Sequence, residues 1–449
     1  MTFTYLFIII TPIILFLYNI INLKFLFRLL VLCAITLFIY LFNITQISYN
    51  GIIFVDNWKI FLLTLVLLLF VVITNLTYRD HFDVYLLYFL VLIGSLVIIL
   101  CDHLLIIYLG LELQTFSLFI LISKDRTSIK GSEAGLKYFI LGAISSGIYL
   151  LGLCLIFLSG VSLSLKSLLI HSNDSFVLLG TTLILISFCF KLGLSPFHFW
   201  LPDIYEGSSW SVLTILSTIP KISVLCVFVQ LLINTNLIIF CCLGSVIIGT
   251  LGAFNQTKLK RLLAYSSISQ MGFIILGITM VIPIGYEISF IYLLIYMITI
   301  LSIFIMIIIT PTLKECYIVE LGGLHYINRI LSLTWLIMFL SVAGIPPLSG
   351  FISKWFILWN IIFTDYFFSS IILIIFSIVG AVYYLRIIKI VYFQKQACYL
   401  TWNKILTKES ITNNYNTIFL GFGLFFSFLF IINLNPLLVI INYLFLYFY

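Results

Sequence analysis

The stretch from residue 190 to residue 202 reads Phe190-Lys191-Leu192-Gly193-Leu194-Ser195-Pro196-Phe197-His198-Phe199-Trp200-Leu201-Pro202. It interrupts a long apolar run with a lysine, a glycine and two prolines. Proline removes a backbone donor and clashes with the preceding turn, so a helix that enters this stretch must break. A second stretch reads Gly344-Ile345-Pro346-Pro347-Leu348-Ser349-Gly350, and it predicts a second break.

The composition predicts that both breaks lie in a membrane. The chain has 449 residues, of which 63% are hydrophobic and only 8% are charged. This leaves too little polar surface for a soluble globule, and many apolar runs are long enough to span a bilayer. The fold class is therefore predicted to be all-α, a polytopic membrane protein. Irregular backbone at membrane depth persists only where it is buried in protein or lines a wet cavity, so the breaks are candidate functional positions.

Hydropathy predicts fourteen spanning helices, of which the seventh and the twelfth contain the breaks. The predicted segments are 3–22, 25–43, 58–78, 84–101, 103–123, 133–160, 176–199, 209–233, 236–254, 262–283, 286–312, 328–363, 367–393 and 415–446. The first of them has no Arg-rich or Ser-rich leader, so we expect a spanning helix there rather than a transit peptide.

The distribution of basic residues supports this count. The loops that follow odd-numbered helices, with their flanks, hold 16 of the 22 Lys and Arg residues, whereas the opposite loops hold only Lys59 and Lys166. The other four are lysines inside predicted helices. The positive-inside rule therefore places both termini on the outer, proton-rich side of the membrane.

The two breaks are five helices apart, and an offset of five inverts the orientation of a helix. Helices 4–8 and 9–13 are therefore predicted to be inverted repeats, an arrangement in which paired discontinuous helices mark ion sites. The predicted domains are 1–82 for helices 1–3, 83–235 for the first repeat, 236–395 for the second repeat, and 396–449 for a connecting loop with helix 14.

Ionisable side chains interrupt the apolar helices at five positions. They are Glu112, Lys137, Lys191, Lys221 and Lys354. Each costs about 2.5 to 3.5 kcal/mol at mid-membrane on insertion scales, so the set suggests a charge pathway. For any one of them the alternative is a structural ion pair, or a lysine whose amine reaches the interface. That alternative applies most to Lys137, which lies only a few residues into its helix.

The chemistry of these side chains suits protons. Desolvation disfavours the charged forms of both Lys and Glu, so both approach neutrality when buried. A nearby carboxylate restores the charge on a lysine, and a nearby cation removes it, so a series of lysines can load and release a proton in turn. His198, beside the first break, is a candidate relay, with a hydrogen-bonded structural histidine as the alternative.

Nothing in the sequence predicts a cofactor. The nine cysteines form no CxxC pair, and the chain has no glycine-rich phosphate loop and no dinucleotide fingerprint. We therefore expect no iron–sulfur cluster, zinc or nucleotide in this chain, and no nucleic-acid partner.

Five motifs together resemble the N-type antiporter-like subunits of respiratory complex I. They are Gly110-Leu111-Glu112-Leu113-Gln114-Thr115, Glu133-Ala134-Gly135-Leu136-Lys137-Tyr138-Phe139, the stretch 190–203, Lys260-Arg261-Leu262-Leu263-Ala264-Tyr265-Ser266-Ser267, and Ala343-Gly344-Ile345-Pro346-Pro347-Leu348-Ser349-Gly350-Phe351. The resemblance covers roughly residues 60–395. A lysine in helix 12 favours this type over the similar M-type, which carries a glutamate there.

The resemblance implies a proton channel and a set of partners. The family's channel residues on helices 5, 6, 7, 8 and 12 fall on Glu112, Lys137, Lys191, Lys221 and Lys354. The implied partners are lipids and other membrane-arm subunits, including a neighbouring M-type subunit and the small K-type subunit. NADH, FMN, iron–sulfur clusters and ubiquinone are implied for other subunits. The implied location is the mitochondrial inner membrane, with both termini in the intermembrane space.

Three functions remain open at this point. The first is proton translocation, without a redox centre in this chain, driven by quinone reduction elsewhere in a complex. The second is an Mrp-type cation/proton antiporter, which would depend on sodium and not on NADH. The third is a structural spacer whose buried charges carry nothing.

Overall fold

The computed structural model describes residues 47–49, 53–76, 82–125, 127–171, 174–231, 235–280, 283–310, 317–394, 414–432 and 438–442. The predicted helices 3–22 and 25–43 lie outside these residues. The described chain is almost entirely helical and divides into two compact units.

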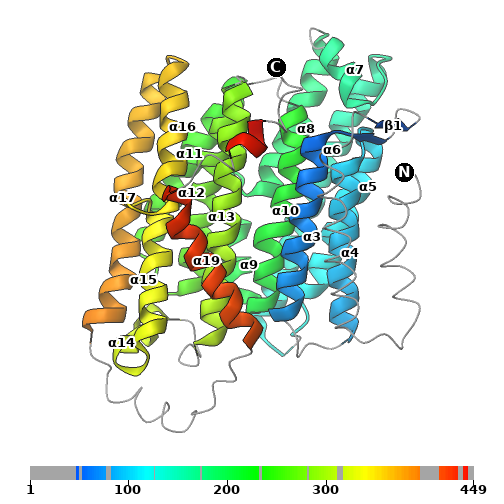
Figure 1. Cartoon of the computed structure of the whole chain (residues 1–449). Coiled ribbons are helices and arrows are strands. Elements are labelled where there is room, and N and C mark those ends of the chain that lie inside the picture. The colour runs from blue at the N-terminus through cyan, green and yellow to red at the C-terminus, as the bar shows by residue number, and fades with distance from the viewer. Residues whose placement is uncertain are drawn as a thin grey trace. The chain divides into compact units, whose positions relative to one another are not determined.

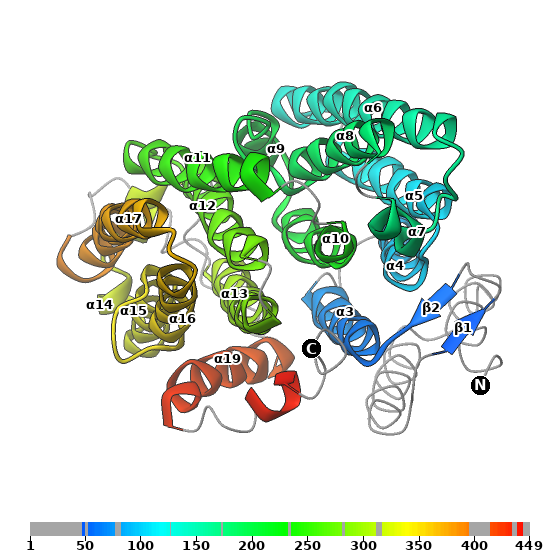
Figure 2. The same cartoon turned by 90° about the horizontal axis from the view of Figure 1, so that it is seen from above.

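The first unit comprises the described residues of Met1–Leu192 and Gly207–Asn234. Its elements are β1 (Ile47–Tyr49), β2 (Ile53–Val55), α3 (Asn57–Leu76), α4 (Phe82–Leu100), α5 (Leu104–Ile122), α6 (Ile129–Leu158), α7 (Leu165–Ile170), α8 (Ser175–Leu192) and α10 (Trp210–Gln230). Helix α10 packs against α3, α4, α5 and α8, which lie along its sides within this unit (Figure 2). It is the central helix of this unit and is buried along almost its whole length.

The second unit comprises the described residues of Gly193–Glu206 and Thr235–Tyr449. Its elements are α9 (Trp200–Gly207, whose last residue belongs to the first unit), α11 (Thr235–Phe254), α12 (Leu259–Thr279), α13 (Pro283–Ile309), the 3₁₀ helix η1 (Ile318–Leu321), α14 (Leu324–Ile327), α15 (Arg329–Ala343), α16 (Ser349–Phe363), α17 (Phe367–Phe393) and α19 (Asn414–Ile432). Helix α12 packs against α11, α13 and α16, and α17 packs against α11, α15 and α16 (Figure 1).

The predicted all-α membrane fold is confirmed. Within the described residues, ten helices are long and apolar enough to cross a membrane, and α15 and α16 are shorter apolar helices. Over their described residues, the predicted segments from 58–78 to 367–393 coincide with an observed helix, or for 328–363 with two helices around a break, and α19 covers the first part of 415–446. The one sheet that the structure describes is the antiparallel ribbon of β1 and β2, in which Ile47 pairs with Val55. The ribbon and α7 were not predicted.

Both predicted breaks are present, and each begins at a glycine with left-handed backbone. Gly193 has φ 73° directly after α8, and Gly344 has φ 80° as the C-cap of α15. A residue with a Cβ adopts this region at a cost, so glycine ends each helix here. Helix α8 therefore stops at Leu192 instead of at residue 199, and α9 begins only at Trp200.

Two glycines set the contact between α6 and α8. A Cβ on Gly180 would lie 2.8 Å from the Gly152 carbonyl oxygen and 2.6 Å from Ile156 Cγ1. Small residues at helix interfaces let backbones approach closely, which replaces the hydrophobic driving force that lipid cannot supply. The close approach of α6 and α8 therefore depends on the absence of side chains at these two positions.

We predict that Gly180→Leu separates α6 from α8 and destabilises the chain by about 1 to 3 kcal/mol, the usual range for overpacking. The thermal unfolding midpoint in detergent measures the effect. Gly147→Leu is the control, because nothing lies within 4 Å of a Cβ at that position of α6. Equal midpoints for the two variants would contradict the assigned contact.

Candidate functional site

Glu112 lies in the middle of α5 and is partly buried. Its carboxylate oxygen Oε2 accepts a hydrogen bond from Thr115 Oγ1, one turn later on the same helix, at 3.4 Å. The carboxylate also interacts electrostatically with Tyr138 of α6 and with Lys191 of α8. Glu112 therefore faces the side of α5 where α6 and α8 lie.

Lys191 occupies the last turn of α8, two residues before the glycine that ends this helix. Its Nζ atom is buried and donates no hydrogen bond to any residue in the described part of the chain. Glu112 acts on it through space, without a direct hydrogen bond. A buried amine that interacts electrostatically with a carboxylate, without a hydrogen bond to it, can gain or lose its proton when the charge of that carboxylate changes.

Lys221 lies near the middle of α10, directly after Pro220, and is only 4% exposed. The proline cannot donate the backbone hydrogen bond that a helix requires at its position, so the helix is locally weakened beside the amine. Gln114 Nε2 of α5 donates to Ser223 Oγ of α10 at 3.2 Å. Polar groups therefore connect α5 and α10 near the level of Lys221.

Lys354 occupies the equivalent break in the second unit. Its Nζ donates to the carbonyl oxygen of Ala343, the last residue of α15, at 2.8 Å, and lies 5.6 Å from the Phe273 ring centroid. The carbonyls at a helix C-terminus carry partial negative charge, so they stabilise a cation. The side chain starts on α16 and reaches back to α15, so it bridges the break.

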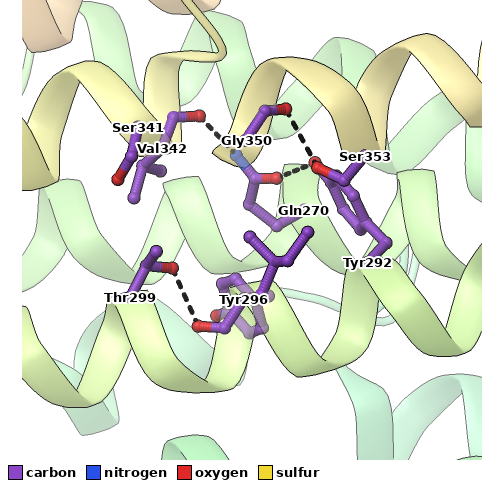
Figure 3. A pocket seen from close by; sticks show the side chains of 9 residues that line it. Gln270, Tyr292, Tyr296, Thr299, Ser341, Val342, Gly350 and Ser353 are labelled. Carbon is purple, nitrogen blue, oxygen red and sulfur yellow. Dashed lines mark hydrogen bonds between the residues drawn. The ribbon is translucent and has the colours of Figure 1, made fainter. Parts of the chain in front are cut away.

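A small cavity lies beside this break, between α12, α13, α15 and α16. Figure 3 shows its lining, in which Gln270 Nε2 donates to the Val342 carbonyl oxygen at 3.4 Å and Tyr292 Oη donates to Gln270 Oε1. Its volume is about 10 Å³, which is roughly enough for one water molecule. The adjacent carbonyls of Val342, which lines the cavity, and Ala343 therefore accept from Gln270 and Lys354, respectively.

The two remaining predicted site residues are Lys137 and His198. Lys137 pairs with Glu133 one turn earlier on α6, at 2.6 Å, and 39% of its side chain is exposed. His198 is 5% exposed, lies between α8 and α9, and packs its ring against Phe199 with centroids 4.4 Å apart. Their roles in proton transfer stay predictions.

One buried ion pair was missed. Lys59 lies at the start of the predicted helix 58–78 and was counted with the flank of an outer loop, whereas its side chain is fully buried in the first turn of α3. Its Nζ lies 2.6 Å from Oδ1 of Asp102, whose side chain is 7% exposed. The partners are 43 residues apart in the sequence. Each lies at the end of an apolar segment, where a charge is normally solvated, so the sequence did not predict the pair.

Acidic residues of α9 pair with the basic start of α12 within the second unit. Glu206 lies 2.5 Å from Lys258 Nζ and 3.4 Å from Arg261 Nη1, and Asp203 lies 3.7 Å from Arg261 Nη2. In the sequence, the basic run 258–261 contributes to the charge bias of the loops that follow odd-numbered helices. The ion pairs also hold the helix that follows the first break against α12.

Glu287 is a further buried acid that was not predicted. It is 7% exposed in the first turns of α13. Glu287 lies at the start of the predicted segment 286–312, where a glutamate is normally solvated. The sequence alone therefore does not indicate that it is buried.

The sequence matches the family described as NADH:quinone oxidoreductase/Mrp antiporter, transmembrane, over residues 101–383. The NADH-ubiquinone oxidoreductase chain 2 of Metridium senile is 38% identical over 359 residues, which cover 78% of this chain and 93% of that protein. The NADH-quinone oxidoreductase subunit N of Pelagibacter ubique is 36% identical, with 80% of each chain covered.

Solved structures agree with the sequence comparisons. A chain of respiratory complex I from Thermus thermophilus, solved with bound aureothin, superposes with a TM-score of 0.81 at 25% identity and covers 96% of this chain and 97% of its own. A chain of the Mrp complex from Dietzia sp. has a TM-score of 0.83 at 19% identity, covers 95% and 92% respectively, and shows the fold alone. The chain therefore belongs to the NADH:quinone oxidoreductase/Mrp antiporter family, among the proteins named chain 2 or subunit N of NADH:quinone oxidoreductase.

Proposed function

We propose that this chain moves protons across the membrane as the N-type antiporter-like subunit of NADH:ubiquinone oxidoreductase. The observation that carries the proposal is the buried Lys191 amine, which has no hydrogen-bond partner among the described residues and senses Glu112. A structural lysine would be expected to have its donors satisfied, because an unpaired buried charge is costly. A proton carrier must instead alternate between a charged and a neutral state.

In the first unit, proton transfer starts with the charge of Glu112. When Glu112 is ionised, it stabilises protonated Lys191, and when its charge is neutralised or drawn away, Lys191 gives up its proton. Lys221, on the central helix α10, is the next acceptor. Each transfer through water moves one proton and leaves an ammonium on the acceptor and a neutral amine on the donor.

In the second unit, Lys354 is the proposed terminal site. The Ala343 carbonyl accepts from its ammonium, and the small cavity around Gln270 is lined by Val342, the neighbour of Ala343. The field across the membrane does work of about 2.3 kcal/mol per charge per 100 mV, so the last site must release its proton and not merely hold it. Hydrogen bonding to a single carbonyl leaves the other donors of the ammonium available for that release.

The wider setting is part of the same proposal. Quinone reduction in other subunits drives the transfer, and NADH, FMN, iron–sulfur clusters and ubiquinone bind there. The location is the mitochondrial inner membrane, with both termini in the intermembrane space and with M-type and K-type subunits as neighbours. Lys137 and His198 are proposed as accessory groups on the route.

We predict that Lys191→Ala lowers the number of protons pumped per NADH oxidised while the complex still assembles. Assembly is expected because the amine makes no hydrogen bond whose loss would leave a partner unpaired. A positioned acid–base group contributes about 100-fold or more to a transfer rate, so flow through this chain should nearly stop. Proton uptake and NADH oxidation are measured together in reconstituted vesicles.

Lys124→Ala is the matched control, because Lys124 is exposed beyond the end of α5. Wild-type pumping in an assembled Lys191→Ala complex would refute the assignment of this residue. Sodium-dependent transport without any requirement for NADH would instead support the Mrp-type alternative.

We also predict that Lys354→Glu retains more pumping than Lys354→Ala. A carboxyl group still titrates, and in its protonated form it can donate to a backbone carbonyl as the lysine does, whereas alanine does neither. Proton uptake into vesicles is compared at matched amounts of assembled complex. Equal pumping by the two variants would mean that titration at this position is not required.

A further inference from the structure

A second set of buried charges lies in the first unit, outside the residues proposed above. Lys59 and Asp102 form an ion pair of 2.6 Å whose side chains are 0% and 7% exposed. Lys59 is in the first turn of α3, and Asp102 lies between the end of α4 and the start of α5. Desolvating both charges costs several kcal/mol each, and such a pair often adds no net stability.

Asp56 lies immediately before α3 and faces this pair. Its Oδ1 atom is buried and accepts no hydrogen bond from the described residues, while the Trp58 side chain donates to the carboxyl group. The charged groups that face it are Lys59, Asp102 and Lys166. Burial raises the pKa of the Asp56 carboxyl above its ordinary value, and Lys59 counters part of that rise. The carboxyl group is therefore poised to accept a proton.

The cluster of Asp56, Lys59 and Asp102 lies along α10 from Lys221. Cys226 of α10 interacts electrostatically with all three charges, so the cluster lies beside this part of the helix. Cys226 is five residues after Lys221, which is about 7.5 Å along the axis at about 1.5 Å per residue. Helix α10 packs against both α3 and α4, whose ends carry the cluster. The cluster therefore lies about one to two helical turns from Lys221 along α10.

Backbone contacts cover the cluster without using its charged side chains. Leu165, the first residue of α7, donates its amide to the Asp102 carbonyl at 2.9 Å, and Ile53 of β2 forms a bridge with Cys101. Figure 1 shows β1, α7 and the start of α3 at the same end of this unit. These segments close that end by backbone hydrogen bonds, so its geometry does not depend on Asp56. The charge bias predicts that this end faces the outer side.

We infer that Asp56, supported by the Lys59–Asp102 pair, is a proton-binding site through which the first unit exchanges protons with the outer aqueous phase. The inference rests on the proposed function and adds an outer-side site for the first unit, separate from the terminal site proposed at Lys354 in the second unit. The Lys221 ammonium transfers one proton through water to the Asp56 carboxylate, which leaves a neutral amine and a neutral carboxyl group. Asp56 then releases that proton to the outer phase and returns to the carboxylate. The Lys59–Asp102 pair, with its atoms 2.6 Å apart, lies beside the carboxyl group that takes up the proton.

The test uses the whole complex with Asp56→Asn, which keeps the size of the side chain and removes its titration. We expect assembly and NADH oxidation to be retained, fewer protons to be pumped per NADH, and a protonated-carboxyl band to be lost from infrared difference spectra. Asp174→Asn is the matched control, because Asp174 is an exposed aspartate just before α8. Wild-type pumping together with an unchanged infrared spectrum in Asp56→Asn would overturn the inference.

Two further variants separate the remaining explanations. If Asp56→Asn does not assemble, Asp56→Glu retains a carboxyl group and should pump with an altered pH dependence, and an unaltered pH dependence would refute the inference. Lys191→Ala is measured in parallel. Impaired pumping in Lys191→Ala with normal pumping in Asp56→Asn would reject only this inference, whereas normal pumping in both would reject the proposed function as well.

Discussion

The cost of holding a charge in an apolar interior governs how this protein is organised. Most buried charges in the described chain are compensated by a partner of a definite kind. Lys59 pairs with a carboxylate, Lys354 binds a carbonyl at the end of a helix, and Glu206 lies against two cations. Lys191, like one carboxylate oxygen of Asp56, is instead buried without a hydrogen bond to the described residues, and Glu112 acts on its amine only through space. A buried amine without a fixed partner suits a function that requires its charge to change.

The two units place a lysine at a helix break in different ways. Lys191 precedes its break and lies at the end of α8, whereas Lys354 follows its break and reaches back to the end of α15. Both breaks begin at a glycine with positive φ, so both expose backbone carbonyls that no longer have a helical partner. Lys354 therefore has a fixed hydrogen-bond acceptor, the Ala343 carbonyl, whereas the charge of Lys191 depends on that of the Glu112 carboxylate.

Much of the fold could be predicted, because hydropathy and proline determine helices and breaks locally. The observed helix boundaries differ from the predicted ones where a glycine ends a helix early or where contacts with another helix order a polar segment. Helix α8 ends at Gly193, before the first proline, and α9 contains acidic residues that resembled a loop but pair with α12. Glu112, Lys191, Lys221 and Lys354 could be found because a charge inside an apolar run stands out. Lys59 could not be recognised as buried, because its partner is distant in sequence and both residues lie at segment ends.

The most direct test is the replacement of Lys221, which is buried in α10. Lys221 is proposed to receive a proton from Lys191 and to pass it to Asp56. Lys221→Met keeps the length and apolar stem of the side chain and removes only the ammonium. The ratio of protons pumped to NADH oxidised is measured in vesicles that contain matched amounts of assembled complex. The account predicts a lower ratio than in the wild type. An unchanged ratio would contradict it.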